Sequence, residues 1–382
     1  MIKILTVIGA RPQIIKAAAL SRAVREHFAD RINEIILHTG QHYDDNMSQV
    51  FIDQMQVPRP DYNLKVGSKS HGKQTAEMVT GIEDVLLREK PHCIVLYGDT
   101  NSTLAGAVAG SKLHVPVVHI EAGLRSYNKR MPEEINRITC DHTSTLLFSP
   151  TLTGVENLWK EGFAKDSEPP YSIDNPKICH SGDIMYDNTL YFRTIAPEFS
   201  TVINDLELNG KPYILGTIHR DNNTDEPGRL NEIFKGILEV ARQHNVQIIL
   251  PLHPRTSKVL DKNLDTDLLQ RISNDPLIRI TEPVSFFDMI ILEENATLIM
   301  TDSGGVQKEA YFHKKPCIIL RPETEWVEIV EQGTAIIADA DAGNIVNAYN
   351  ELISKTDLSY PPIFGDGKAG EYICQEMVQH FE

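Results

Sequence analysis

The chain has 382 residues, which is long for one domain and sufficient for two domains of about 100–200 residues each. Its 41% hydrophobic and 24% charged residues are typical of a globular protein and exclude an intrinsically disordered chain. The net charge of −16 is opposite in sign to that of a general nucleic-acid-binding protein. Any anion site must therefore be a local cluster of cationic side chains and backbone N–H groups.

The cysteines and the hydropathy pattern indicate the compartment. Five cysteines are scattered along the chain without a CxxC pair, which favours a reducing environment and argues against a zinc ribbon. No apolar run reaches about 18 residues, and no signal-peptide cleavage pattern is present. His38 and His42 lack the one-face spacing of metal ligands. We expect a cytoplasmic protein without a metal site.

Strand and helix signals alternate along the chain. In the first half, the pattern predicts strands over residues 2–8, 34–38, 93–97 and 115–120, and helices over residues 14–28, 44–55, 73–89 and 103–113. The second half repeats this alternation, with strands over residues 213–217, 246–250, 298–301 and 317–320 and a helix over residues 228–244. Such alternation of fully apolar strands with helices is typical of parallel sheets covered on both faces. The predicted fold class is therefore α/β, with two doubly wound, Rossmann-like domains.

A polar, proline-rich segment over residues 165–176 marks the expected domain boundary. We predict a first domain over residues 1–172 and a second over residues 173–365, with a final helix over residues 366–382 that packs back on the first domain. In open α/β sheets, ligands bind beyond the carboxyl ends of the strands, where many of the polar residues of interest lie.

Two strand-to-helix junctions have sequences that suit anion binding. Gly9-Ala10-Arg11 begins one helix, and Lys16 adds a second cation. Ser303, Gly304 and Gly305 begin another, where the glycines allow a phosphate to approach the N-terminal N–H groups. Plain βα turns have the same appearance, and the second junction is the stronger candidate. Glu309, farther along the second helix, is placed to accept hydrogen bonds from ribose hydroxyls.

Acidic and histidine side chains supply the candidate chemistry. Asp99 and Glu121 follow neighbouring strands of the first domain, and Glu133 begins a helix after Pro132, where a structural role in the first turn is the alternative. Carboxylates gathered at one site can support proton abstraction. His219 and His253 end strands of the second domain and either contact phosphate or lie in polar surface loops.

Five motifs occurring in order resemble the non-hydrolysing UDP-N-acetylglucosamine 2-epimerases: IGARPQIIKAA, GDTNSTLAGA, HIEAGLRS, MPEEINR and TDSGGVQKEA, with FGDGKA closing the chain. The resemblance covers nearly the whole chain. It implies a glycosyltransferase-B architecture, in which two Rossmann-like domains face a cleft, and a cytoplasmic homodimer that makes UDP-sugars for cell-surface polysaccharide.

The resemblance also implies roles for individual residues. Asp99, Glu121 and Glu133 would be the acid/base carboxylates, and Arg137 would orient them or contact the substrate. A second set would bind UDP: Arg11, Lys16, His219, Ser303, Gly304, Gly305 and Glu309. A regulatory substrate site found in some members would lie near Gln41, His42 and Gln74.

The chain departs from the commoner family pattern at two places. It has ARPQ where that pattern has TRPE after the first strand, and Glu325-Trp326-Val327-Glu328 where that pattern has ERPE. Both variants resemble a branch that includes epimerases of UDP-2,3-diacetamido-2,3-dideoxyglucuronic acid, so the hexose stays open between the two substrates. A glycosyltransferase of the same architecture and a catalytically silent sugar-nucleotide sensor are the alternatives from other functional classes.

The expected chemistry needs no cofactor. Oxidation at C3 would acidify the C2 proton but requires a nicotinamide. The GxGxxG match at residues 365–370 has too few residues after it for a βαβ unit. Elimination of UDP with removal of the C2 proton, followed by re-addition through a 2-acetamidoglucal, is the remaining route.

Overall fold

The structure is a computed structural model that describes residues 1–41, 59–252 and 254–382. The chain divides into two compact units, one of residues Met1–Asn188 and Pro362–Glu382 and the other of residues Thr189–Pro361. The expected helix over residues 44–55 lies outside the described residues.

The first unit is built on a parallel sheet in the order β3-β2-β1-β4-β5-β6-β7. Its strands are β1 (Ile2–Ile8), β2 (Ile32–His38), β3 (Tyr62–Asn63), β4 (Cys93–Tyr97), β5 (Val117–Ile120), β6 (Leu146–Ser149) and β7 (Lys177–His180). Strands β4 and β5 are buried along their whole length, as expected for central strands covered on both faces.

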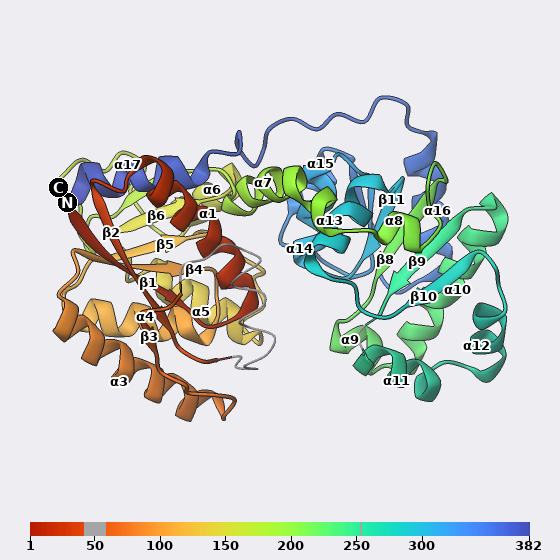
Figure 1. Ribbon diagram of the computed structural model, residues 1–382, viewed down its shortest axis with the longest axis horizontal. Helices are drawn as coiled ribbons and strands as arrows, with labels where there is room; N and C mark the ends of the chain where they lie inside the picture. The colour runs from red at the N-terminus through yellow and green to blue at the C-terminus, as the bar shows by residue number, and fades with distance from the viewer. Residues whose placement is uncertain (42–58, 253) are drawn as a thin grey trace. The chain divides into compact units, whose positions relative to one another are not determined.

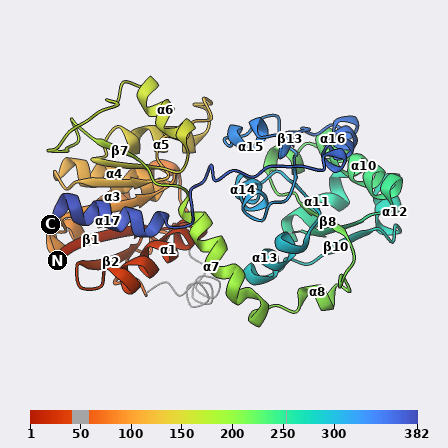
Figure 2. The same ribbon diagram turned by 90° about the horizontal axis from the view of Figure 1, so that it is seen from above.

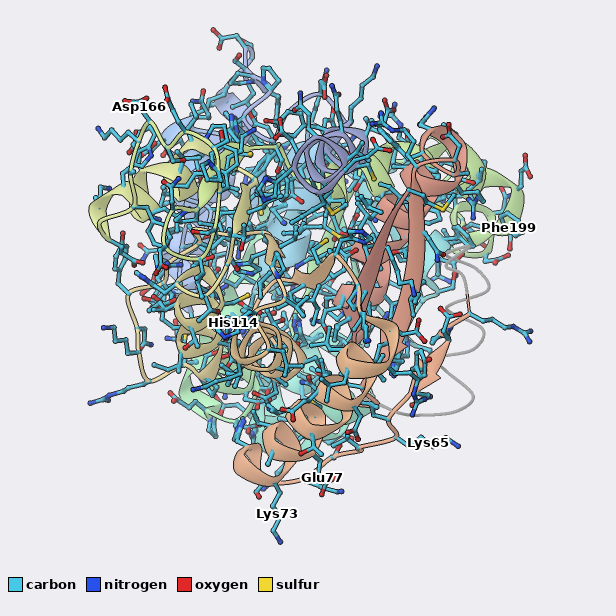
Figure 3. The ribbon with its side chains drawn as sticks, turned by 90° about the vertical axis from the view of Figure 1, so that its left-hand side faces the viewer. Lys65, Lys73, Glu77, His114, Asp166 and Phe199 are labelled. Carbon is cyan, nitrogen blue, oxygen red and sulfur yellow. The ribbon has the colours of Figure 1, made fainter. Side chains whose placement is uncertain are left out.

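Helices cover both faces of this sheet. They are α1 (Arg11–His27), α3 (His71–Glu89), α4 (Asn101–Lys112), α5 (Pro132–Asp141), α6 (Leu152–Lys160) and α17 (Ala369–Phe381). Helix α17 lies along α1 on one face, and α3 and α4 pack together on the other (Figures 1 and 2). Figure 3 shows the exposed side chains of Lys73 and Glu77 projecting outward from α3, whose apolar side, including Met78 and Ile82, is buried.

The division between the units falls within α7 (Ile184–Phe199), whereas the sequence placed it after residue 172. The physical reason is that β7 pairs with β6 in the first sheet, so residues 173–188 belong with the first unit. Strand β7 is short and only partly buried, and this gives it a weak sequence signal.

The second unit has a parallel sheet in the order β10-β9-β8-β11-β12-β13. Its strands are β8 (Tyr213–Thr217), β9 (Gln247–Pro251), β10 (Ile278–Thr281), β11 (Leu298–Thr301), β12 (Cys317–Ile319) and β13 (Ala335–Ile337). Its helices are α8 (Val202–Asp205), α9 (Asp221–Thr224), α10 (Pro227–His244), α11 (Pro254–Asn263), α12 (Thr266–Ser273), α13 (Phe286–Asn295), α14 (Gly304–Phe312), α15 (Val327–Glu331) and α16 (Ala342–Ser354).

Both sheets reverse their strand order at one place, between β1 and β4 in the first unit and between β8 and β11 in the second. Crevices beyond the carboxyl ends of strands at such switch points are the usual ligand sites of open α/β sheets. The predicted class, with two Rossmann-like parallel-sheet units, is confirmed. All five cysteines are buried and free. Within the described ranges, no helix is both long and apolar enough to cross a membrane.

Candidate functional site

The switch point of the first unit is closely packed around Gly9, at the end of β1. A side-chain carbon at Gly9 would lie 2.2 Å from Thr39 Oγ1 and 2.2 Å from Ser102 Oγ, so only glycine fits. Helix α1 starts directly afterwards, and Arg11, its first residue, has an exposed side chain. Gln13 fixes this start, because its side chain accepts a hydrogen bond from the Ala10 N–H at 3.1 Å.

Lys16 and Glu121 form an ion pair at the switch point of the first sheet. The Lys16 ammonium on α1 forms an ion pair with Glu121 Oε2, just beyond β5, and both side chains are 11% exposed. A side-chain carbon at Gly98 would lie 3.0 Å from each of these groups, so the pair lies against the turn that leads to Asp99. Glu121 has a φ of 75°, a left-handed conformation that is unusual for glutamate and often marks a functional site.

Asp99 is held through Arg137. The Arg137 guanidinium on α5 pairs with Asp99 Oδ2 and donates a hydrogen bond to Glu134 Oε2 at 3.0 Å. Asn136, on the same helix, donates to the Asp99 carbonyl at 2.8 Å. Glu133 lies apart from these contacts: its side chain is exposed, and Arg137 pairs with Glu134 and Asp99 instead.

A buried ionic network contacts the two turns that carry Asp99 and Glu121. His119 Nδ1 lies 2.6 Å from Asp141 Oδ1, and its Nε2 lies 2.8 Å from the Gly98 carbonyl. Asp141 also accepts a hydrogen bond from the Gly123 N–H at 3.2 Å and pairs with Arg125 Nη1 at 2.7 Å. The network therefore contacts the residue before Asp99 and the second residue after Glu121.

Opposite charges keep this network ionised. Burial opposes the charge of His119, but Cys140 and Asp141 outweigh it and raise the pKa of His119 well above its ordinary value. Burial also opposes the ionisation of Asp141, yet His119 and Arg125 together hold the pKa of Asp141 below its usual range. Because a carbonyl oxygen only accepts, His119 Nε2 donates the hydrogen bond to Gly98.

Gln41 and Gln74 both reach the start of α4. Gln41 Oε1 accepts hydrogen bonds from the Ser102 N–H at 3.2 Å and the Ser102 hydroxyl at 2.8 Å. Gln74 Oε1 accepts one from Asn101 Nδ2 at 2.8 Å. His42, which was grouped with these residues, lies outside the described residues.

In the second unit, Ser303 caps α14 at the end of β11. The Ser303 hydroxyl accepts a hydrogen bond from the Val306 N–H at 3.4 Å, and Gly304 and Gly305 form the first turn. Gly305 is exposed and Gly304 is partly exposed, so the N-terminal N–H groups and the positive end of the helix dipole are accessible to an anion.

His219 joins this site through Asp302. The fully buried carboxylate of Asp302 lies 3.1 Å from His219 Nδ1 and accepts hydrogen bonds from the backbone N–H groups of His219 and Arg220. Burial works against the charge of Asp302, but His219 and the neighbouring donors hold its pKa below its usual range. The His219 side chain is 51% exposed, so the imidazole is oriented by Asp302 on one side and exposed to solvent on the other.

Glu309 is one and a half turns into α14 and lies next to Glu293 on α13. Burial and then the Glu309 carboxyl raise the pKa of Glu293 well above its usual value. His313 Nε2 lies 3.8 Å from Glu293 Oε2 in the same buried cluster. His253, predicted to follow β9, lies outside the described residues.

Several residues that shape the site were missed by sequence reasoning: Gln13, His119, Asp141 and Asp302. Asp302 had the most accessible signal, because it directly precedes Ser303 in the motif that was recognised. His119 and Asp141 act through contacts between residues distant in sequence, and Gln13 acts on the start of its own helix and on the Tyr97 carbonyl, so sequence spacing alone does not reveal these roles. Among the described residues, no three His, Cys, Asp or Glu side chains gather as metal ligands would.

The sequence matches known proteins over nearly its whole length. The family model for UDP-N-acetylglucosamine 2-epimerase matches residues 25–378. A UDP-N-acetylglucosamine 2-epimerase homolog from Methanococcus maripaludis is 44% identical over 376 residues, which cover 98% of this chain and 99% of the relative. The UDP-2,3-diacetamido-2,3-dideoxy-D-glucuronate 2-epimerase of Pseudomonas aeruginosa is 44% identical over 378 residues, which cover 99% of each chain.

Solved structures of the same family are similar to this chain over nearly its whole length. The crystal structure of the Methanocaldococcus jannaschii UDP-GlcNAc 2-epimerase in complex with UDP-GlcNAc and UDP is 40% identical, covers 99% of both chains and gives a TM-score of 0.84. The Neisseria meningitidis UDP-GlcNAc 2-epimerase bound to UDP-GlcNAc is 28% identical and gives a TM-score of 0.83, over 99% of this chain and 100% of the other. The predicted class of enzyme, an isomerase that acts as a UDP-sugar 2-epimerase, is confirmed, and the chain belongs to the UDP-N-acetylglucosamine 2-epimerase family.

Proposed function

We propose that this enzyme interconverts UDP-GlcNAc and UDP-ManNAc by eliminating UDP and adding it back. The observation that carries the proposal is the meeting of Lys16 and Glu121 beside Gly98-Asp99 at the switch point of the first sheet. Two carboxylates, each paired with a cation, can remove a proton from C2 on one face and return one on the other.

In the proposed elimination, a carboxylate of the first unit takes the C2 proton, and the electrons of that C–H bond form the C1=C2 double bond. The C1–O bond breaks, and its electrons go to the oxygen of the β-phosphate. UDP then adds back to the 2-acetamidoglucal while C2 receives a proton on the opposite face. No electrons are lost or gained overall, so no redox cofactor takes part.

We assign the departing UDP to the second unit. The N-terminus of α14 at Ser303, Gly304 and Gly305 would stabilise the charge that develops on the β-phosphate, together with His219. Arg11 would hold phosphate, as the family resemblance implies, and Glu309 would bind the ribose. Glu133 is proposed as an acid/base residue on the family resemblance. His253 is proposed as a phosphate contact because it follows the predicted strand over residues 246–250.

UDP-2,3-diacetamido-2,3-dideoxyglucuronate is the second candidate substrate, with the same chemistry. The 44% identity to the P. aeruginosa enzyme of that name favours it. A proton NMR assay of the purified protein with each sugar nucleotide and no acceptor tests both candidates. Appearance of the C2 epimer of UDP-GlcNAc supports the first proposal. Turnover of only the diacetamido uronic acid assigns the second substrate, and no epimer from either would contradict both.

We also propose that the enzyme is a cytoplasmic homodimer that supplies UDP-sugars for cell-surface polysaccharide. The five buried free cysteines support a reducing compartment. Light scattering coupled to gel filtration measures the mass directly. A mass near twice 42.9 kDa supports the dimer, and a mass near 42.9 kDa contradicts it.

A further inference from the structure

The loop that follows β12 is anchored to the first two turns of α14. Trp326, which is 5% exposed, donates a hydrogen bond from its indole Nε1 to the carbonyl of Gly304 at 2.9 Å. Its backbone N–H donates to Thr324 Oγ1 at 3.0 Å, and the Thr324 hydroxyl donates to Gln307 Oε1 at 2.6 Å. The loop therefore holds both the first residue of α14 and the residue three positions later.

The indole of Trp326 also faces a buried cation. Lys308 Nζ lies 4.2 Å from the centre of the indole ring, and Lys308 is only 3% exposed. Gly304 and Lys308 are one turn apart, so they lie on the same side of the helix. A single side chain thus contacts the first carbonyl of α14 through its N–H and the ammonium one turn later through its aromatic face.

An ion pair completes this support without adding net charge. Arg321 binds Glu325 through two contacts, at 3.1 Å and 2.9 Å, and a side-chain carbon at Gly304 would lie 3.6 Å from Glu325 Oε2. Because Arg321 neutralises Glu325, the carboxylate next to the glycine turn repels an anion less. The commoner family pattern has arginine at the position of Trp326, so in this chain an indole stands where that pattern places a cation.

We propose that Trp326 is a positioning residue of the UDP site, which fixes the glycine turn of α14 and the Lys308 ammonium in the arrangement that receives the diphosphate. This inference rests on the proposed binding of UDP at α14. It assigns the support of the cradle to a residue that does not itself touch the nucleotide.

The two tryptophans of the chain provide the test and its control. Trp159, on α6, also has a lysine over its ring, with Lys165 Nζ at 4.7 Å, but its Nε1 has no hydrogen-bond partner among the described residues. Trp326→Phe removes the bond to Gly304 and keeps an aromatic face, whereas Trp159→Phe removes an unused N–H. Loss of one hydrogen bond should raise the Kd for UDP roughly two- to tenfold in Trp326→Phe. Trp159→Phe should leave it unchanged.

Tryptophan fluorescence supplies a readout that would not respond to UDP if Trp326 served only the stability of the fold. In the Trp159→Phe variant, Trp326 is the only tryptophan, and saturating UDP should change the tryptophan emission. Wild-type UDP affinity in folded Trp326→Phe, or an emission that saturating UDP does not alter, would overturn the inference. If Trp326→Phe does not fold, the inference is tested by the tryptophan emission of Trp159→Phe and by the UDP affinity of Thr324→Val. Thr324→Val should also weaken UDP binding.

The same titrations separate this inference from the proposed function. If the wild-type protein does not bind UDP at all, the proposed function fails. If the wild type binds UDP and Trp326→Phe binds it equally well, only the role of Trp326 fails.

Discussion

The ammonium of Lys16 pairs with the carboxylate of Glu121, joining the first helix of the first unit to the end of β5. This contact spans the switch point of the sheet, because β4 lies between β1 and β5. The pair lies against Gly98, directly before Asp99. The central proposal is that proton transfer at C2 takes place here.

Lys16→Met should lower kcat by about 100-fold or more, because Glu121 loses the cation that orients it. The Kd for UDP should change much less if the main partner of Lys16 is Glu121. Steady-state kinetics and calorimetry measure the two effects separately. Lys3→Met is the matched control, since Lys3 pairs with Glu89 at 3.3 Å at the opposite end of β1. A large rise in Kd with unchanged kcat would instead assign Lys16 to phosphate binding.

Gly123→Ala should abolish activity and destabilise the fold. Gly123 has a φ of 80°, and a side-chain carbon there would lie 2.2 Å from the Gly154 carbonyl oxygen, so the turn that follows Glu121 would have to shift. Gly162→Ala provides the comparison, because Gly162 has a φ of 99° but no atom within 4 Å of such a carbon. Gly162→Ala should lower the free energy of unfolding only by the backbone strain, about 1–3 kcal/mol, and should keep activity. Equal losses in both variants would show that the clash is unimportant.

Asp141→Asn should reduce the free energy of unfolding by about 3–5 kcal/mol, because it leaves His119 and Arg125 buried without their common carboxylate. The lowered pKa of Asp141 gives stability that is present above its unfolded pKa and lost as the pH falls through the folded pKa. The variant should therefore lose less stability than the wild type as the pH falls below about 3.9, the unfolded pKa of aspartate, in urea titrations at several pH values. Asp166→Asn, at an exposed position labelled in Figure 3, should match the wild type. A stability loss below 1 kcal/mol in Asp141→Asn would contradict the importance assigned to the network (a threshold of about the size of a typical mutation).

Glu293→Gln should change how the free energy of unfolding depends on pH above the unfolded pKa of Glu293. Burial and the Glu309 carboxyl raise the pKa of Glu293 in the folded protein, so between its unfolded pKa of about 4.3 and the raised folded value the folded state binds more protons. The free energy of unfolding should therefore fall as the pH rises through this window. Glu293→Gln should remove that slope, and Glu294→Gln, at a half-buried position on the same helix, should keep it. The same slope in all three proteins would contradict the raised pKa.

Much of the fold could be predicted because its strands are short apolar runs bounded by glycine or polar residues. Residues 2–8, 93–97, 213–217 and 298–301 are strands with the predicted bounds. Helix α1 begins at Arg11, before the predicted start at residue 14, because Gln13 caps it and proline is tolerated in a first turn. Strand β7 could not be assigned to the first sheet, since its pairing with β6 depends on contacts distant in sequence.

The candidate site was only partly accessible from the sequence. Residues directly beyond strands, such as Asp99, Glu121 and Ser303, could be proposed as candidates because parallel strands bring their carboxyl ends to one edge. The pairing of Lys16 with Glu121 could not, because it depends on which strands are neighbours. The joining of Arg137 to Glu134 rather than to Glu133 depends on the rotation of α5, which the acidic pair Glu133-Glu134 leaves ambiguous.

Exchange of the C2 hydrogen with solvent deuterium tests the central claim most directly. Wild-type enzyme incubated with UDP-GlcNAc in D₂O should place deuterium at C2 of both epimers, as followed by NMR and mass spectrometry. Asp99→Asn and Glu121→Gln should each abolish this exchange while binding UDP with wild-type affinity. Wild-type exchange rates in both variants would contradict the assignment of proton transfer to these two carboxylates.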